Sequence, residues 1–257
     1  MPAADSCLLT ALRRIAAGLA IGLCAFFSLP GAVAEPAGPV RIGLEGPQRA
    51  AWAAVGRLQI GPEGHCTATL IAPDVVLTAA HCLFSPQTGR ARLATRLQFR
   101  PGWWDGPGRL RLRGWAVAVA ETYRYDGATT GPGGDIALVR LAGAAPARLV
   151  PFPPATEPAQ AGERVAVLSY GRDRPDQPSI EPGCRILRRA GSVLLTDCEA
   201  LPGVSGAPLL RLRGGEAEVI GVVSSRLGPE NAETGPAVAV ALDAHIETLR
   251  SRLAPRR

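Results

Sequence analysis

Residues 201–208 read LPGVSGAP, a run of small residues around a single serine. A serine hydroxyl is a poor nucleophile at neutral pH, and it becomes a good one when an imidazole accepts its proton and a carboxylate holds that imidazole in the right tautomer. The chain supplies both partners upstream, because His81 lies in the run TAAHC and Asp135 lies in the run GDIALVRL. The three runs predict a triad of Ser205, His81 and Asp135.

Each residue of this triad, when it is considered alone, also has a non-catalytic explanation or a rival elsewhere in the chain. A GxSG run arises by chance in many proteins, and His81 alone could be an ordinary core histidine. Asp105 and Asp126 are rival carboxylates, both in glycine-rich loops, whereas only Asp135 begins an apolar strand. The combination of all three runs in one chain is what favours the triad.

The rest of the chain predicts short strands. Its 257 residues include 30 glycines and 24 prolines, and 47% are hydrophobic, which is enough for a sizeable core. Apolar runs alternate with turn signals in two sets, separated by residues 150–158, whose four prolines cannot lie in a central strand. The expected strands are residues 54–60, 66–71, 75–79, 93–100, 110–121 and 136–141, followed by 164–170, 184–190, 192–197, 207–213, 218–224 and 237–241.

One helix is expected, at the C-terminal end of the chain. Apolar residues recur there at near-helical spacing, with Asp243 as the candidate N-cap and His245 expected on the surface. The recurring residues are Leu242, Ile246, Leu249 and Leu253.

Six strands, a linker, six strands and a terminal helix predict an all-β fold of two antiparallel six-stranded β-barrels. Closing each sheet removes its exposed edges. The N-terminal barrel, residues 51–150, would carry the histidine and the aspartate, and the C-terminal barrel, residues 151–241, would carry the serine. Residues 242–257 would form the helix and tail. We expect the active site in the cleft between the barrels.

Residues 1–34 predict a secretory signal peptide, with Arg13 and Arg14 before an apolar stretch and with AVA as the cleavage site. An uncleaved membrane anchor is the alternative, although the apolar stretch is short for a span. Residues 35–50 could be a short propeptide or an N-terminal arm. We expect a secreted or periplasmic protein with no membrane span after the signal is removed.

The cysteine count supports export. Removing the signal peptide removes Cys7 and Cys24 and leaves four cysteines, which imply two disulfides. Three pairings are possible, and we predict the local pairs Cys66–Cys82 and Cys184–Cys198, each contributing about 3 kcal/mol. A zinc site built from His65, His81 and the cysteines beside them is the alternative, but it needs reduced thiolates, which an exported chain disfavours.

The charge pattern argues against a nucleic-acid partner. All 28 basic residues are arginine, and the formal net charge is +6. The arginines are scattered, whereas nucleic-acid binding is typical of a basic stripe with interleaved aromatic residues.

Three segments resemble the trypsin-type serine proteases, which use the same chain order of histidine, aspartate and serine. These are CTATLIAP to LTAAHC over residues 66–82, DIALVRL over residues 135–141 and GVSGAP over residues 203–208. The run VLSYG at residues 167–171 is similar to the opening strand of their second barrel. The resemblance covers about residues 50–253 and is closest to the bacterial branch that includes the glutamyl endopeptidases.

The resemblance implies a secreted serine endopeptidase that cleaves polypeptides, needs no cofactor or metal and acts as a monomer. Ser205 would attack the scissile carbonyl, His81 would act as general base, and Asp135 would orient His81. The backbone N–H groups of Gly203 and Ser205 would form the oxyanion hole. Ser224 lies where the family places a serine hydrogen-bonded near the catalytic carboxylate.

Some residues depart from the family pattern. Val204 stands where animal trypsins have the aspartate that pairs with the new amino terminus, so we expect no activation of that kind. Glu199 aligns with the floor of the primary pocket, where a carboxylate would favour Arg or Lys side chains; the alternative is a solvated or structural Glu199. The run VVS at residues 222–224 offers no pocket histidine, so a preference for glutamate is not supported.

Two function classes therefore remain beside the endopeptidase. One is a catalytically impaired binding protein on the same fold, and the other is the zinc-binding module.

Overall fold

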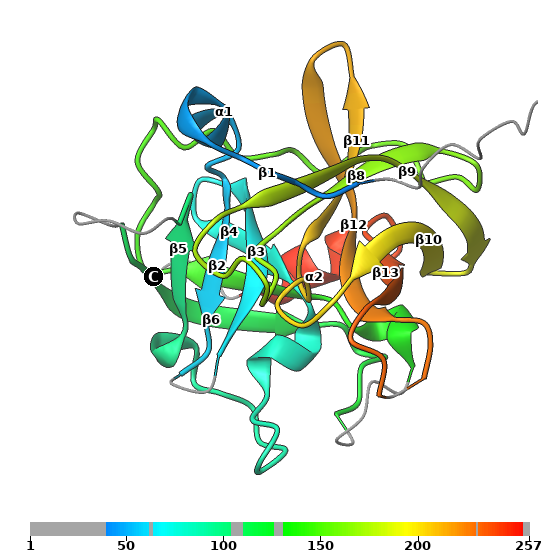
Figure 1. The fold of residues 1–257 in the computed structure, drawn as a ribbon. Helices are drawn as coiled ribbons and strands as arrows, with labels where there is room; N and C mark the ends of the chain where they lie inside the picture. Colours follow the sequence, from blue (N-terminus) through cyan, green and yellow to red (C-terminus); the bar gives the residue numbers. More distant parts are fainter. Residues whose placement is uncertain (1–39, 62–63, 104–109, 126–130, 230, 254–257) are drawn as a thin grey trace, which may run out of the picture. The chain divides into compact units, whose positions relative to one another are not determined.

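Two β-barrels dominate the described part of the chain, which is residues 40–253 without 62–63, 104–109, 126–130 and 230 (Figure 1). In this computed structural model, these residues belong to one unit, Ala37–Arg257. The predicted signal peptide, with Cys7 and Cys24, lies outside the described residues, as do Asp105 and Asp126.

The first barrel is built from six short, mostly apolar segments. Its strands close in the antiparallel order β2-β3-β4-β7-β6-β5. The predicted run 93–100 divides into a short 3-10 helix, η2 (Ala94–Arg96), and a four-residue strand. The strands are β2 (Val55–Gln59), β3 (His65–Ala72), β4 (Val75–Thr78), β5 (Gln98–Pro101), β6 (Leu112–Val119) and β7 (Ala137–Leu141).

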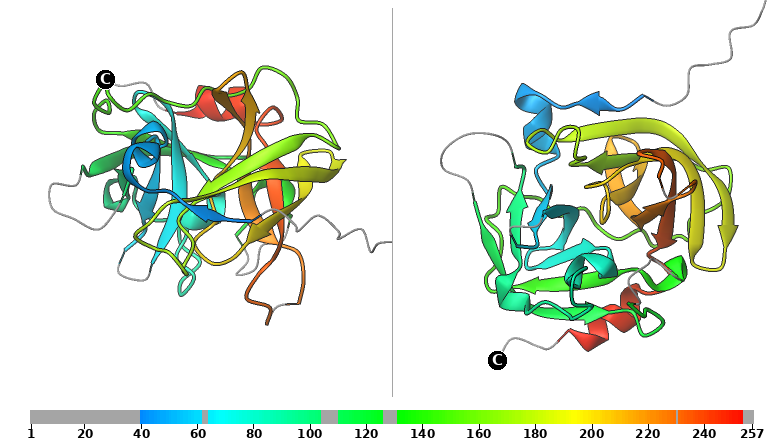
Figure 2. Two further views of the ribbon diagram at one scale, coloured as in Figure 1. Left: turned by 45° about the horizontal axis from the view of Figure 1, so that its top comes forward. Right: turned by 60° about the horizontal axis from the view of Figure 1, so that its bottom comes forward.

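The second barrel also has six strands, and it carries an extra strand at its edge. The sheet order is β1-β9-β10-β13-β12-β11-β8, and an additional pairing of β9 with β8 closes the barrel. The prediction of two closed antiparallel six-stranded barrels is confirmed (Figure 2). The strands are β8 (Arg164–Ser169), β9 (Ser179–Ala190), β10 (Val193–Ala200), β11 (Pro208–Arg213), β12 (Glu216–Arg226) and β13 (Gly235–Ala241).

The N-terminal arm has structure that its sequence did not predict. It contains the two-residue strand β1 (Ile42–Gly43), paired with β9, and the six-residue helix α1 (Gly46–Ala51). Elements this short are invisible to an analysis of hydrophobic period, because a period needs several repeats to be recognised.

The C-terminal helix α2 (Ile246–Arg252) begins later than expected. Asp243 is not its N-cap; instead, its carboxylate accepts a hydrogen bond from Arg189 at 2.7 Å, and His245 is the N-cap residue. The apolar stripe was identified correctly, because Ile246 and Leu249 are both buried.

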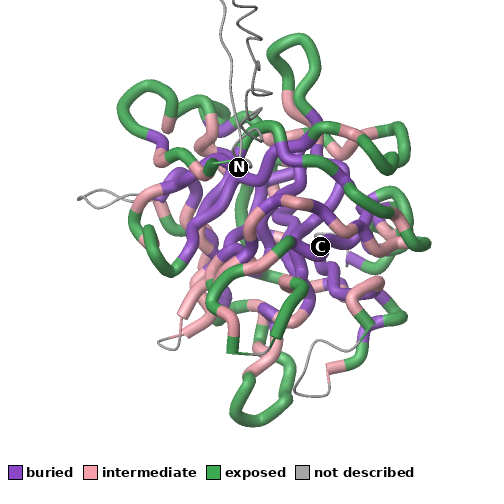
Figure 3. The backbone as a smooth tube through the Cα atoms, turned by 45° about the vertical axis from the view of Figure 1, so that its right-hand side comes forward, coloured by how far each residue is buried: buried purple, intermediate pink, exposed green. Residues whose placement is uncertain are grey.

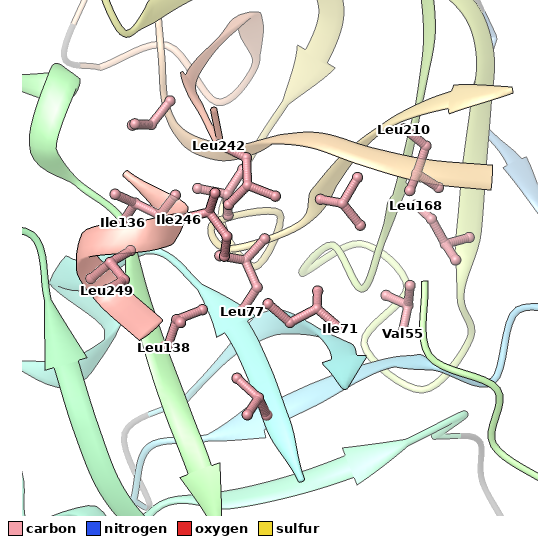
Figure 4. Close-up of a cluster of buried hydrophobic side chains, with 14 of the residues drawn as sticks. Val55, Ile71, Leu77, Ile136, Leu138, Leu168, Leu210, Leu242, Ile246 and Leu249 are labelled. Carbon is pink, nitrogen blue, oxygen red and sulfur yellow. The ribbon is translucent and has the colours of Figure 1, made fainter. Parts of the chain in front are cut away.

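The largest hydrophobic cluster is shared by both barrels. It joins Leu77 and Leu138 of the first barrel to Leu168 and Leu210 of the second, and Leu249 of α2 packs into it (Figure 4). Figure 3 shows this buried interior in purple, surrounded by exposed loops in green. Because apolar packing at the junction fixes the two barrels against each other, loops from both can form one precisely shaped site.

The linker touches both barrels as it passes. Phe152 N–H donates to the carbonyl of Leu70 in β3, and Ala155 N–H donates to the carbonyl of Val219 in β12. The Pro153 carbonyl accepts the Val219 N–H at 2.8 Å, so Pro154 forms an isolated parallel bridge with β12 that needs no N–H from proline.

Both predicted disulfides are present. Cys66 is bonded to Cys82 with Cα atoms 6.2 Å apart, and Cys184 is bonded to Cys198 with Cα atoms 5.2 Å apart. Within the described ranges, we find no helix that is long and apolar enough to cross a bilayer.

Candidate active site

His81 is held in place by the chain on both sides of it. It lies in the 3-10 helix η1 (Ala80–Leu83), directly after the fully buried strand β4. The next residue, Cys82, is disulfide-bonded to Cys66 in β3. The backbone at His81 is therefore tied to the barrel through a covalent bond, while the imidazole remains partly exposed.

Asp135 receives three hydrogen bonds. It follows the 3-10 helix η3 (Pro132–Gly134) and has no exposed surface. Its Oδ2 lies 2.7 Å from His81 Nδ1 and 2.5 Å from Ser224 Oγ, and its Oδ1 accepts the His81 N–H at 2.8 Å. A carboxylate paired in this way fixes the imidazole with Nδ1 as the donor and Nε2 turned away from the acid.

The electrostatics of Asp135 favour its ionised form. Burial alone would raise the pKa of Asp135, but the hydrogen bonds and charge of His81 and the hydroxyl of Ser224 outweigh it, so the pKa lies below its usual value. Asp135 can therefore stabilise a positive charge on His81 throughout the neutral range.

Ser205 lies on the turn between β10 and β11, and this turn is attached to both barrels. Its carbonyl accepts the N–H of Thr67 in β3 at 2.8 Å, and the next N–H, from Gly206, donates to Val223 in β12 at 2.7 Å. Thr67 Oγ1 also donates to the Gly203 carbonyl and accepts from the Tyr170 N–H, at 2.8 and 3.0 Å. Ser205 and His81 line one pocket.

Glycine is required beside Ser205. Gly206 has a φ of +81°, and a Cβ there would lie 2.2 Å from the Thr67 carbonyl oxygen. A larger residue would push the turn away from the first barrel.

In the described part of the chain, no hydrogen bond joins Ser205 Oγ to His81. The Nε2 atom of His81 instead lies 3.6 Å from Cys82 Sγ. Such bonds are often long without substrate and tighten in the complex.

Two N–H groups beside Ser205 have no protein acceptor among the described residues, those of Gly203 and of Ser205 itself. The Pro202 carbonyl accepts the Arg172 N–H at 2.7 Å. Because the carbonyl and N–H of a trans peptide point in opposite directions, the Gly203 N–H is directed away from Arg172. Gly203 has a φ of +95°, which glycine adopts without strain.

A pocket of about 340 Å³ opens beside Ser205 and His81. Its walls are three segments of the second barrel: the end of β10 with the turn after it, the middle and end of β12, and the loop that follows β12. Besides Ser205 and His81, the lining residues are Ala200, Leu201, Pro202, Val223, Ser224, Ser225, Arg226 and Gly228.

A family model described as Trypsin matches residues 41–247, which cover both barrels and all three members of the triad. The chain belongs to the trypsin family. The family consists of serine proteases, and the match supports a serine protease here. The match does not address the glutamyl endopeptidase branch. A search of curated proteins found no match.

Glu199 does not lie at the floor of the pocket, where the resemblance to the trypsin-type proteases placed it. It is absent from the lining, and its Oε2 lies 3.8 Å from Arg41 Nε on a half-exposed side chain. The cause is strand geometry: successive side chains of β10 point to opposite faces, and Ala200 is the one that faces the pocket. Arg226 is the charged residue that reaches the lining instead.

The loop before Asp135 is held by two residues that the sequence did not indicate. The carbonyl of Gly133 accepts Ser192 Oγ at 2.8 Å and lies 2.7 Å from His245 Nε2. His245 was expected on the surface and is instead half-buried against this loop. No local motif surrounds His245 or Ser192, so only the tertiary structure identifies them.

The thiolates that the zinc alternative requires are absent from the described residues. Cys66, His81 and Cys82 lie close enough to share an ion, but both cysteines are in one disulfide. His65 is separately engaged, because its Nε2 lies 2.9 Å from the Tyr170 carbonyl, and burial lowers its pKa.

Proposed function

We propose that this trypsin-family protein is an exported serine endopeptidase that cleaves polypeptides through an acyl-enzyme. The observation that carries the proposal is the buried Asp135 carboxylate, which holds His81 through both its side chain and its backbone N–H beside Ser205. Burying a charge is costly unless the charge is paired and hydrogen-bonded, and at Asp135 the pairing orients an imidazole that lines the same pocket as a serine hydroxyl.

The reaction has two halves. Ser205 Oγ attacks the scissile carbonyl carbon as His81 Nε2 takes the hydroxyl proton, and the oxyanion accepts hydrogen bonds from the N–H groups of Gly203 and Ser205. His81 then gives the proton to the leaving amine, and the C–N bond breaks. Water, activated by His81, hydrolyses the acyl-enzyme and restores Ser205. Asp135 stays ionised throughout and stabilises the imidazolium.

Export is supported by the disulfides. Cys66–Cys82 lies beside the general base, and such bonds persist in oxidising compartments. A signal peptide at residues 1–34, cleaved after Ala34, would deliver the chain to the periplasm or outside the cell.

The primary pocket favours residues other than arginine and lysine. Arg226 lines it, whereas the Glu199 carboxylate lies outside it near Arg41. A positively charged residue in the lining disfavours a cationic substrate side chain and favours an anionic or hydrogen-bonding one, and Arg226 Nη1 donates to the Pro229 carbonyl at 2.7 Å in the loop beside the pocket.

A fluorophosphonate probe tests the function. We expect the mature protein to be labelled at Ser205, with no labelling of Ser205→Ala or of protein pretreated with a peptide aldehyde. A folded protein that resists the probe would instead support a binding protein on the same fold. Stoichiometric zinc together with four free thiols would support the metal-binding alternative. Peptide-library profiling of unlabelled protein from a preparation that the probe shows to be active then gives the specificity.

A further inference from the structure

The N-terminal strand β1 pairs with β9 of the second barrel, the barrel that carries Ser205. Ile42 and Gly43 pair with Ile180 and Ser179 of β9, and the Leu44 N–H donates to the carbonyl of Pro178 at 2.8 Å. Figure 1 shows β1 crossing beside β9. The chain segment before the first barrel is therefore part of the second barrel's sheet.

Arg41, the residue before β1, points its side chain into this junction. Only 10% of the side chain is exposed; its Nη2 donates to Asp173, and its Nε lies 3.8 Å from Glu199 Oε2. The packing is tight, because a Cβ on Gly171 would lie 2.6 Å from Arg41 Nη1 and 3.0 Å from Leu201 in the pocket wall. Arg41 thus contacts the 171–173 loop, and Gly171 of that loop lies against Leu201 of the pocket wall.

The loop that Arg41 holds is the one that fixes Gly203. The Arg172 N–H donates to the Pro202 carbonyl, which directs the Gly203 N–H the other way. A Cβ on Gly203 would lie 2.6 Å from the Tyr170 carbonyl oxygen and 3.0 Å from Arg172 N, so residues 170–172 lie directly against it. Movement of this loop would turn the peptide that supplies the first oxyanion donor.

Acidic side chains surround the Arg41 guanidinium. Asp173 and Glu199 face it, and the Glu199 N–H donates to both carboxylate oxygens of Glu181 at 3.0 and 2.9 Å. Glu181 is only 1% exposed. Arg41 is the cation that lies between the carboxylates of Asp173 and Glu199, and Arg174 Nε lies 3.9 Å from Asp173 on its other side. Val204, fully buried, supplies no charge to the turn.

We propose that Arg41 is a positioning residue for the oxyanion hole, holding residues 171–173 and 199–202 so that the Gly203 N–H faces the reacting carbonyl. Val204 cannot form an ion pair because valine has no charge. The charge near this turn comes instead from Arg41, in the N-terminal segment of the same chain. The proposal rests on the proposed peptidase function, but its second test below does not require activity.

The first test compares the kinetics of Arg41→Met, Arg41→Lys and a control, Arg213→Met. Arg213 is exposed and pairs with Glu157 at 2.8 Å away from the active site. We expect Arg41→Met to lower kcat about tenfold or more with KM changed less than about threefold, because an oxyanion donor acts in the transition state. Arg41→Lys should recover part of kcat, and Arg213→Met should match the wild type. Should Arg41→Met fail to fold, Asp173→Asn takes its place with the same expectation.

The second test measures amide hydrogen exchange in Ser205→Ala protein with and without Arg41→Met. We expect faster exchange at residues 170–173 and 199–205 when Arg41 is lost, and no change there with Arg213→Met. Unchanged kcat, a kcat loss shared equally by Arg213→Met, or unchanged exchange in both segments would overturn the proposal. A wild-type protein that neither hydrolyses peptides nor reacts with the probe would refute the proposed function, and the exchange measurement would still decide the role of Arg41.

Discussion

Ser224→Ala removes one of the three hydrogen bonds to the buried carboxylate of Asp135. Ser224 Oγ lies 2.5 Å from Oδ2, the oxygen that also accepts from His81. A hydrogen bond to a charged group contributes about 1.5–3 kcal/mol, and here the remaining acceptor capacity is sealed from water. We therefore expect the free energy of unfolding at neutral pH to fall by about 2 kcal/mol.

The loss should depend on pH with a defined sign. The hydroxyl donates to the ionised acid and helps to lower the pKa of Asp135, so its removal raises that pKa again. A lowered folded-state pKa gives stability that is present above the pKa of the unfolded chain and is lost as pH falls through the folded one. The difference between wild type and Ser224→Ala should be constant from about pH 8 to pH 5 and shrink in more acid solution.

Urea unfolding at a series of pH values, followed by tryptophan fluorescence, measures this difference. The matched control is Thr196→Val, which removes a buried hydroxyl that donates to the neutral carbonyl of Ala237 at 3.1 Å and accepts the Cys198 N–H at 3.3 Å. Thr196→Val should lower the free energy of unfolding by about 1 kcal/mol at every pH and leave kcat unchanged. We expect Ser224→Ala to lower kcat/KM about tenfold through less precise orientation of His81. A stability loss under about 0.5 kcal/mol, or one that persists unchanged in acid, would refute this account of Asp135.

Three further predictions follow from the site and its surroundings. His81→Ala should lower kcat by about four orders of magnitude or more, because a triad acts as a unit, and a loss below tenfold would exclude His81 from the mechanism. Peptide-library profiling should show a changed primary-site preference for Arg226→Gln and none for Glu199→Gln; the reverse pattern would restore Glu199 as the specificity residue. Burial raises the pKa of Glu181 to about 7, so the stability that its proton supplies is present below its ordinary pKa of 4.5 and lost as pH rises through about 7. Glu181→Gln should therefore gain up to about 3 kcal/mol relative to wild type between pH 5 and pH 8 in denaturant titrations, and a constant difference would contradict this pKa.

The sequence predicted the features that are encoded locally. The barrels follow from short apolar runs between turns, and the two disulfides follow from cysteines close in the chain. His81, Asp135 and Ser205 were recognisable because each lies in a run whose neighbours are constrained by the same strand or turn. The contacts of Asp135 with His81 and Ser224 give these assignments a physical basis that the runs alone lacked.

The features that were mispredicted depend on which side chains of a strand face the pocket and on contacts with residues far away in the sequence. Glu199 and Ala200 are neighbours, and a one-residue difference along a strand reverses which side chain faces a site. Asp243 has the residue type of an N-cap, but a better partner, Arg189, lies 2.7 Å away from its carboxylate across the fold. Arg41 is one of 28 arginines, and nothing near it in the sequence indicates that it meets Asp173.

Thr67 of the first barrel is hydrogen-bonded to the turn of the second barrel that carries Ser205. One strand residue of the first barrel engages the nucleophile turn through its N–H and its hydroxyl, and the same hydroxyl reaches the end of β8. Neither half, expressed as a separate fragment, would retain the backbone path that shapes the turn at Ser205. When the junction between the two barrels loosens, the turn at Ser205 loses its shape while each barrel can still be folded. On heating, peptidase activity should therefore be lost at a lower temperature than β-structure.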